Sequence, residues 1–362
     1  MIDFVKFEIK NVELSQFLDN PLLRDNWKIE IDNETAVVES YRCEYKNLFL
    51  KIYEERKTLI AKGSLPKIAN GKNNVDLSFK EITKLFRYLK EDLFIDPSKS
   101  ILRNIEFGLN IEIPKSPNDI LDKFLMYRTN PFIPMRSNST RHKFGGVESN
   151  LSQFRIKIYD KGKQMDLEEN LMRIEIKVNK MQFFKTHKIR IKHLSNLADK
   201  TVLEGLGSIL IEIYGSILKC CKINTETLKP KYQELMKSGC YPSYWTKLHK
   251  EDSQRCFRKR KLFIKLQNEN RLESLHNLIQ NRISKKWQYL LNQSEGMILK
   301  SDENLPLLKA PIIRTELEAS KTKNDENLPL AFSVNFHHFY FSTEWQQKLL
   351  YWIDYLSRIL KT

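Results

Sequence analysis

Three segments alternate between apolar and polar side chains, and this pattern constrains the fold more than any other feature of the chain. They are residues 104–113 (NIEFGLNIEI), 154–161 (FRIKIYDK) and 171–179 (LMRIEIKVN). Because successive side chains of a β-strand point to opposite faces, each segment has one apolar and one charged face. The three segments therefore predict an antiparallel sheet with one face buried against a core and the other exposed to solvent.

The rest of the chain divides into a β-rich first half and a helical second half. Residues 4–63 alternate or are rich in β-forming residues, whereas residues 63–74 (GSLPKIANGKNN) carry the Gly, Pro and Asn of a turn-rich loop. Elsewhere apolar residues recur at helical spacing. The predicted helices cover residues 77–93 with Ser78 as a cap, 117–127, 190–222, 244–267 and 271–291.

These elements predict an α+β fold. We expect a mostly antiparallel sheet domain over residues 1–190, followed by a helical, basic domain over residues 191–300. Residues 301–362 are expected to form a linker loop and a strand–helix appendage, and DENLPL occurs there twice. Each copy has a proline and few apolar neighbours, which indicates a loop and not a structural repeat.

The charged faces of the three predicted strands hold a candidate site. If the strands are neighbours, Glu106, Asn110, Glu175, Tyr159 and Lys161 converge on the face opposite the core. Carboxylate and amide oxygens are hard ligands that hold Mg²⁺ or Mn²⁺ against a phosphate oxygen. A tyrosine hydroxyl becomes a usable nucleophile beside a cation or a metal, because the charge favours its anion. The set therefore indicates phosphoryl transfer to Tyr159, assisted by Lys161.

An ordinary cross-strand ladder explains the same residues without any chemistry. Tyrosine rings and lysine stems cover sheet faces, and glutamates pair with lysines on neighbouring strands. For each residue taken singly this is the more common arrangement. Only their joint position on three strands favours a site.

The strand motifs resemble those of a known family. KIYDKGKQ and LMRIEIK, preceded by RNIEFGLNIEI and by MIDFVKFEI, look like the rolling-circle replication initiators of small plasmids and filamentous-type phages. The resemblance covers about residues 1–190. It implies that Tyr159 nicks one DNA strand and stays joined to its 5′ phosphate, with Lys161 as its partner. It also implies that Glu106 and Glu175 hold a divalent metal.

Two further points concern this implied metal site. Asp3 stands where the family often begins with an acidic residue, although it falls in phase with the apolar Val5 and Phe7. The His-hydrophobe-His motif of another large class of nicking enzymes is absent from the sequence. Any metal would therefore rest on carboxylates and on the amide oxygen of Asn110.

The charge of the chain favours a polyanionic partner. Lys and Arg outnumber Asp and Glu, which gives a formal net charge of +16, and nucleic acid is the usual partner of such an excess. A surface kept basic for solubility is the alternative. The predicted DNA contacts are cations of the strands, of the loop 63–74 and of a dense cluster in helix 244–267: Arg155, Lys157, Arg173, Lys177, Lys67, Arg255, Arg258, Lys259, Arg260 and Lys261.

Cysteine usage and hydropathy bear on the compartment. An odd number of cysteines without paired spacing predicts reduced thiols and a cytoplasmic protein, with no membrane span and no signal peptide. A zinc site of Cys240, His249 and Cys256 is a weak alternative, since no CxxC or HxxxH motif completes it. The five cysteines are Cys43, Cys220, Cys221, Cys240 and Cys256.

The predicted function is that of a metal-dependent, DNA-nicking replication initiator with an origin, partly single-stranded, as its substrate. A host helicase and polymerase are possible partners, and oligomerisation is left open. The alternative is a non-catalytic initiator or repressor whose sheet face only grips DNA. An RNA-binding protein is a weaker third reading, because RNA platforms need several exposed aromatic residues on a sheet.

Overall fold

The three alternating segments form neighbouring antiparallel strands. The computed structural model describes residues 1–135, 145–270 and 275–293. In it β12 (Leu171–Val178) lies between β6 (Ile101–Glu112) and β11 (Phe154–Asp160), and both pairings are antiparallel. The assumption that these strands are neighbours is therefore confirmed.

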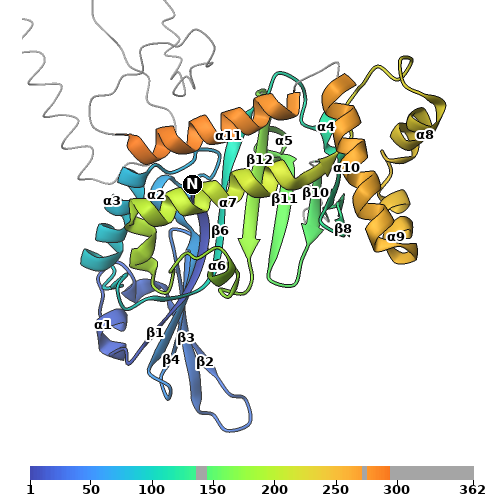
Figure 1. Cartoon of the computed structure of the whole chain (residues 1–362). Helices are drawn as coiled ribbons and strands as arrows, with labels where there is room; N and C mark the ends of the chain where they lie inside the picture. Colours follow the sequence, from blue (N-terminus) through green and yellow to red (C-terminus); the bar gives the residue numbers. More distant parts are fainter. Residues whose placement is uncertain (136–144, 271–274, 294–362) are drawn as a thin grey trace, which may run out of the picture. The chain divides into compact units, whose positions relative to one another are not determined.

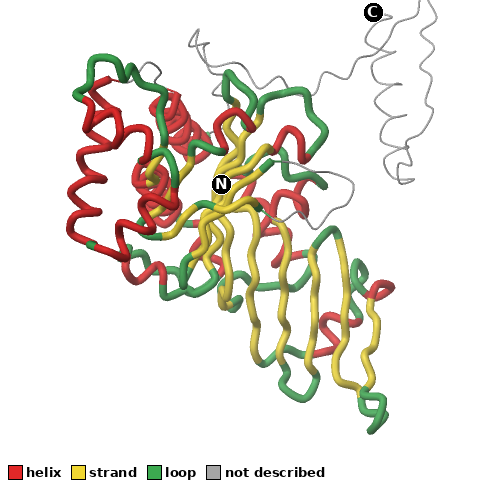
Figure 2. Tube along the Cα trace, turned by 90° about the vertical axis from the view of Figure 1, so that its right-hand side faces the viewer, coloured by secondary structure: helices red, strands yellow, loops and turns green. Residues whose placement is uncertain are grey.

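The same sheet continues on both sides of these strands, to ten strands among the described residues. Figures 1 and 2 show its strands laid side by side. Beyond β6 the order is β1 (Ile2–Lys10), β5 (Thr58–Ser64), β4 (Leu48–Tyr53), β3 (Val38–Tyr45) and β2 (Trp27–Ile31). Beyond β11 follow β10 (Gly146–Asn150) and β9 (Ile133–Pro134).

The apolar face of the sheet packs against helices and makes the main core. Phe107 of β6 stacks near Phe184, with ring centroids 6.4 Å apart, and Trp287 donates its indole N–H to the carbonyl oxygen of Leu203 at 2.9 Å. The helices that contribute to this core include α1 (Leu14–Leu18), α3 (Phe79–Glu91), α6 (Phe183–Thr186), α7 (Lys200–Ser216) and α11 (Leu275–Asn292). Figure 1 shows α7 and α11 crossing this part of the sheet.

A second, smaller core lies around the buried Trp245 and Phe263. Its strands are β7 (Phe124–Tyr127), β8 (Asn130–Pro131) and β13 (Ile217–Lys219). Its helices are α8 (Pro230–Ser238), α9 (Pro242–Glu251) and α10 (Ser253–Asn270). The sheet thus occupies the N-terminal part and helices predominate in the C-terminal part, which confirms the α+β prediction. The predicted appendage and both DENLPL copies lie outside the described residues.

Local sequence signals explain which helices were predicted correctly and which were not. Ser78 caps α3, as the sequence predicted, and it does so in a capping box with Glu81. The predicted loop 63–74 instead contains α2 (Leu65–Asn70), because its Pro66 stands in the first helical turn and Gly71 is the left-handed C-cap with φ of 72°. The predicted helix 117–127 is only α4 (Asn118–Leu121), followed by strand β7.

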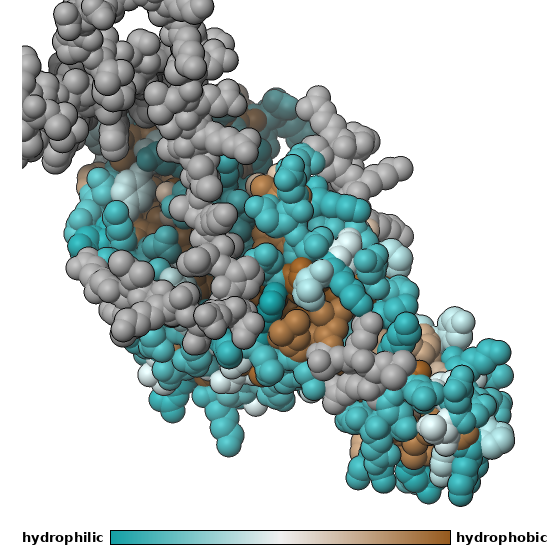
Figure 3. All heavy atoms as spheres, turned by 90° about the horizontal axis from the view of Figure 1, so that it is seen from above, coloured by the Kyte–Doolittle hydropathy of each residue, from teal (hydrophilic) through white to brown (hydrophobic). Residues whose placement is uncertain are grey.

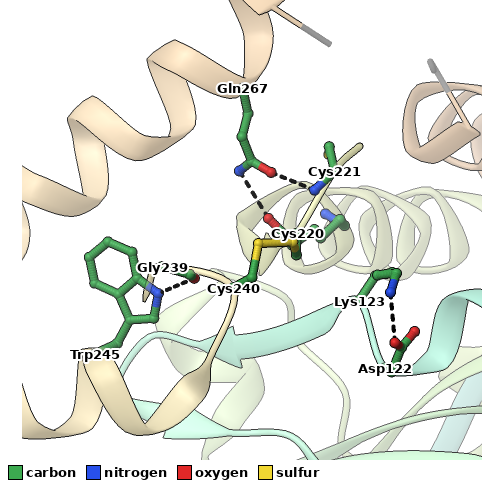
Figure 4. Close-up of a disulfide and its surroundings, with 9 residues drawn as sticks. Asp122, Lys123, Cys220, Cys221, Gly239, Cys240, Trp245 and Gln267 are labelled. Atoms are coloured by element: carbon green, nitrogen blue, oxygen red, sulfur yellow. Dashed lines mark hydrogen bonds and ion pairs between the residues drawn. A yellow bond between two sulfur atoms is a disulfide. The ribbon is translucent and has the colours of Figure 1, made fainter. Parts of the chain in front are cut away.

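The cysteines differ from the prediction of free thiols. Cys220 and Cys240 form a disulfide that joins the end of β13 to the turn after α8 (Figure 4). The pairing could not be read from the sequence, since 20 residues separate the two positions. Cys43, Cys221 and Cys256 are not part of a disulfide. Of the helices that the structure describes, none is both long enough and apolar enough to cross a membrane.

Candidate functional site

The candidate residues form three rows across β6, β12 and β11. Tyr159 lies opposite Arg173, which lies opposite Asn110. In the next row Lys157 faces Glu175, and Glu175 faces Gly108. A Cβ at Gly108 would lie 2.1 Å from the carbonyl oxygen of Ile174, so only glycine permits this close approach of β6 to β12.

The third row runs Arg155, Lys177, Glu106. Lys177 donates to Glu106 Oε1 at 2.6 Å, and Lys157 reaches Oε2 of the same carboxylate at 3.0 Å. Lys157 also donates to Glu175 Oε1 at 2.7 Å. One ammonium therefore links the two predicted acidic residues. Burial alone would lower the pKa of Lys157, but Glu175 and Glu106 raise it to about 12.

Arg173 is the centre of the arrangement and is only 2% exposed. Its guanidinium contacts Glu175 Oε2 at 2.6 Å, Asp3 Oδ2 at 3.0 Å and Asn110 Oδ1 at 3.0 Å. A fourth acceptor, Asp76 Oδ1, lies 3.4 Å away. A guanidinium is the side chain that can satisfy so many acceptors at once, because it has five N–H donors in one plane. Arg173 thus holds residues from three strands and one loop together.

Tyr159 is part of this cluster and is 5% exposed. Its hydroxyl donates to Glu175 Oε2 at 3.3 Å, the oxygen that also receives Arg173. Burial, and then the negative charge of Glu175, raise the pKa of Tyr159 well above its usual value of 10. Burial would also raise the pKa of Glu175, but Arg173 and Lys157 lower it to about 2. In this arrangement Tyr159 is a neutral phenol beside an ionised carboxylate.

Lys161 is placed differently from the prediction. β11 ends at Asp160, which caps α5 (Lys161–Gln164), so strand alternation does not position Lys161. Its side chain is buried, and the ammonium donates to Asn73 Oδ1 at 2.9 Å and to Gln164 Oε1 at 2.7 Å. Burial, and then Arg173, lower the pKa of Lys161 to about 8.

Asp3 joins the cluster because β1 is irregular at this point. The register between β1 and β6 shifts between Ile2 and Phe4. Asp3 therefore leaves the apolar phase in which the sequence placed it. Its carboxylate accepts from Ser64 at 3.0 Å and pairs with Arg173.

Asp76 is a member of the cluster that the sequence did not predict. It lies in the loop between α2 and α3, and Oδ2 accepts the backbone N–H of Asn110 at 2.9 Å and pairs with Lys286 of α11 at 2.9 Å. Burial would raise the pKa of Asp76, but Lys286, the amino terminus and Arg173 lower it to about 2. No sequence signal could identify it, since Lys286 stands far along the chain.

The predicted solvent-exposed face is therefore largely buried over its central rows. Asp3, Glu106, Asn110, Tyr159, Lys161, Arg173 and Glu175 are all buried. The prediction of a solvent-exposed face rests on alternation alone. Alternation shows that two faces differ, but it does not show what lies on the second face. The more open margin of the cluster is Lys177, whose side chain is 33% exposed.

The acidic residues do not fit a divalent metal as they are arranged. All six carboxylate oxygens of Asp3, Glu106 and Glu175 receive a donor: a lysine, Arg173, Ser64 or Tyr159. The amide oxygen of Asn110 receives Arg173. Among the described residues no group of three or more His, Cys, Asp or Glu could hold a metal ion. The zinc set is not assembled either, because Cys240 is in the disulfide. We derive no chemical step through a metal.

The predicted DNA contacts on the strands are engaged within the protein. Arg155 pairs with Glu148 at 3.2 Å, and Lys157 and Lys177 hold Glu106. Arg173, also predicted to contact DNA, lies beneath the surface. Lys67 of α2 is half-buried.

The basic cluster of α10 behaves in the opposite way. Arg255, Arg258 and Lys261 are exposed on one side of the helix, at spacings of three residues. Lys259 donates to the hydroxyl of Tyr244 at 3.1 Å, and Arg260 donates to the carbonyl oxygen of Arg128. Three of the five predicted cations therefore face solvent, in a molecule whose described surface is mainly hydrophilic in the view of Figure 3.

Comparison with known proteins adds little. No protein-family model matches the chain, and no curated protein matches it. Among solved structures it is similar to one described as a rolling circle replication initiator protein from Geobacillus stearothermophilus, with 9% identity and a TM-score of 0.37. That match covers 65% of this chain and 89% of the other. Because identity and TM-score are both low, this likeness alone assigns neither fold nor function.

Proposed function

We propose that the chain initiates DNA replication by nicking one DNA strand, with Tyr159 as the nucleophile. One observation carries the proposal: the Tyr159 hydroxyl donates to Glu175 Oε2 at 3.3 Å, while Arg173 and Lys157 hold the same carboxylate. A hydroxyl, a proton acceptor and two cations are the groups that transfer of a phosphoryl group to tyrosine requires.

The step is a displacement at phosphorus. Tyr159 Oη forms the new P–O bond, its proton passes to Glu175 Oε2, and the P–O3′ bond breaks. The leaving 3′ oxygen takes a proton from Lys161, whose pKa of about 8 suits a general acid near neutral pH. The product is a 5′-phosphotyrosine and a free 3′ hydroxyl, so no oxidant or reductant is needed.

Binding of a phosphodiester would change the charges around Glu175. Glu175 is a weak base while Arg173 and Lys157 lower its pKa to about 2. A phosphodiester that draws those cations toward its own oxygens would raise the basicity of Glu175 and stabilise the developing charge. The proposal therefore requires DNA to displace contacts that the cluster makes within itself.

The exposed side of α10 gives the DNA a place to bind outside the cluster. Arg255, Arg258 and Lys261 are not engaged by the salt bridges that occupy the strand cations, and three such charges neutralise phosphates without reading sequence.

A second candidate function is a non-catalytic initiator or repressor. It is favoured by the burial of Tyr159, which is 5% exposed, and by a pKa well above 10. In that case the cluster only stabilises the sheet, and the chain binds DNA through α10.

One experiment separates the two. The full chain is incubated with labelled single-stranded DNA, with Mn²⁺ and separately with EDTA, and a denaturing gel is read for a covalent adduct. Tyr159→Phe removes one oxygen and should abolish the adduct while DNA binding persists. Tyr127→Phe in β7 is the matched control, because Tyr127 is also 5% exposed but lies outside the cluster. An adduct that survives Tyr159→Phe, or none with the natural chain, would count against nicking by Tyr159.

A further inference from the structure

The outermost strand at the N-terminal end of the sheet has an unpaired edge. β2 pairs with β3 on one side, and no strand among the described residues pairs with its other side. It projects with β3 at the lower end of the sheet in Figure 1. An open edge exposes a row of backbone N–H and C=O groups, which is a template for a further strand.

Strands β2 and β3 form a hairpin that continues the apolar face of the sheet. At the tip of this hairpin the apolar side chains are exposed to solvent. Trp27 packs against the core and donates to the carbonyl oxygen of Phe17 at 3.1 Å. Two residues further, Ile29 is 57% exposed, and Ile31 is 53% exposed. Val37, across the turn, is 61% exposed. Trp27, Ile29 and Ile31 share one face, because they are two apart in a strand.

The opposite face of β2 carries two charges of opposite sign. Lys28 is exposed and lies across from Arg42 of β3, so its neighbour on the paired side has the same charge. Glu30 lies across from Ser40 and pairs with Arg42 at 2.6 Å and Lys51 at 2.9 Å. A carboxylate beside Lys28 on the open side of β2 would therefore offset the repulsion between Lys28 and Arg42.

We propose that β2 pairs with β2 of a second copy of this chain, antiparallel and about a two-fold axis through Ile29. In this register Lys28 of each copy faces Glu30 of the other. Ile29 meets Ile29, and Trp27 faces Ile31. The segment WKIEI is thus self-complementary in both charge and apolar contact.

The two adjacent registers that keep the faces matched are excluded by charge. A shift by one pair of residues places the two-fold axis at Lys28, where the two lysines would meet. A shift the other way places it at Glu30, where the two glutamates would meet. Like charges directly opposite one another destabilise a strand pair. A slip of a single residue would bring an apolar face against a charged one.

This pairing is short, so the dimer should be reversible. Strand pairing over the five residues of β2 buries less surface than a stable obligate dimer requires. We therefore expect a monomer–dimer equilibrium that depends on protein concentration. The proposal does not depend on the proposed nicking function, since β2 contributes no residue to the cluster around Arg173.

The test measures the mass of the full chain by sedimentation velocity over a wide range of concentration. Ile29→Lys places two ammonium groups at the axis and should weaken association at least about tenfold. Val37→Lys is the matched control, because Val37 is equally exposed but lies outside β2, and it should leave the dimer intact. A chain that stays monomeric throughout, or a dimer that Ile29→Lys does not weaken, overturns the proposal.

Charge reversal then tests the register itself. Lys28→Glu and Glu30→Lys should each weaken self-association, because like charges now face each other twice in the dimer. Mixed together, the two variants should form a heterodimer, since both cross-pairs become attractive. Circular dichroism checks that Glu30→Lys folds; if it does not, Lys28→Glu alone must still weaken the dimer. Two folded variants that do not form a heterodimer contradict this register.

Discussion

The two cationic regions of the molecule, the cluster around Arg173 and the exposed side of α10, use their charges in different ways. In the first, Arg173, Lys157 and Lys177 are paired with carboxylates that come from three strands, β1, β6 and β12. In the second, Arg255, Arg258 and Lys261 face solvent. The net charge of +16 does not distinguish them.

The difference lies in what water can reach. A buried cation must have its partners, because an unpaired charge out of water is very costly. An exposed cation contributes little to folding and keeps its charge for a ligand. The cations of the sheet cluster therefore stay paired with carboxylates of the protein until a ligand displaces them. Within the described residues, the exposed cations of α10 are free of such pairs and can contact an anionic ligand directly.

The largest expected effect is on folding, from Arg173→Met. This change keeps the length of the side chain but leaves the carboxylates of Asp3, Glu175 and Asp76 without their shared partner. We expect the free energy of unfolding to fall by about 3–5 kcal/mol, the usual cost of breaking a buried ion pair. Arg258→Met on α10 is the control, and it should change stability by less than about 0.5 kcal/mol. Urea unfolding of both variants measures the difference, and equal losses would contradict it.

The next effect is the response to acid. Folding lowers the pKa of Glu175 from 4.5 to about 2, and that of Asp76 from 3.8 to about 2. A lowered carboxyl pKa contributes stability that is fully present above the unfolded value and is lost as pH falls through the folded value. Unfolding free energy should therefore drop between pH 4.5 and pH 2. Glu175→Gln should make this drop shallower, and an unchanged acid profile would mean that Glu175 is not held ionised.

The smallest effect on stability is expected from α10. Replacing Arg255, Arg258 and Lys261 with Gln should leave unfolding almost unchanged. DNA affinity should fall, and the slope of log K against log salt should decrease by about 2 to 3, near 0.9 for each lost phosphate contact. Replacing Lys259 and Arg260, which contact the protein, should change the slope less. A slope that does not change in the triple variant removes this side of α10 from the interface.

Sequence patterns recovered the elements whose signals are local. The alternation of residues 104–113, 154–161 and 171–179 identified β6, β11 and β12 and their apolar side, and the Ser78 cap identified α3. The same signals misled where they have two meanings. Pro66 and Gly71 read as loop residues, yet they begin and end α2. Lys161 is two residues after Tyr159, yet the strand ends between them.

The rest of the site depends on contacts between distant parts of the chain. Asp76 reaches Asn110 across 34 residues, and Lys286 reaches the Asn110 carbonyl oxygen across 176. Such contacts bury the polar face and decide which acids hold which cations. Neither periodicity nor spacing contains that information. The disulfide was missed for a related reason, since neither of its two cysteines has a strong local signal.

The central claim, that Tyr159 is the nucleophile, is tested most directly by locating the bond to DNA. The chain is reacted with a short single-stranded oligonucleotide, digested with trypsin and a nuclease, and analysed by mass spectrometry. Trypsin should release residues 158–161, because it cleaves the chain after Lys157 and after Lys161. The account predicts a nucleotide 5′-phosphate attached to Tyr159 in this peptide, and none in the Tyr159→Phe variant. A nucleotide found on another residue, or an unmodified peptide beside cleaved DNA, would contradict it.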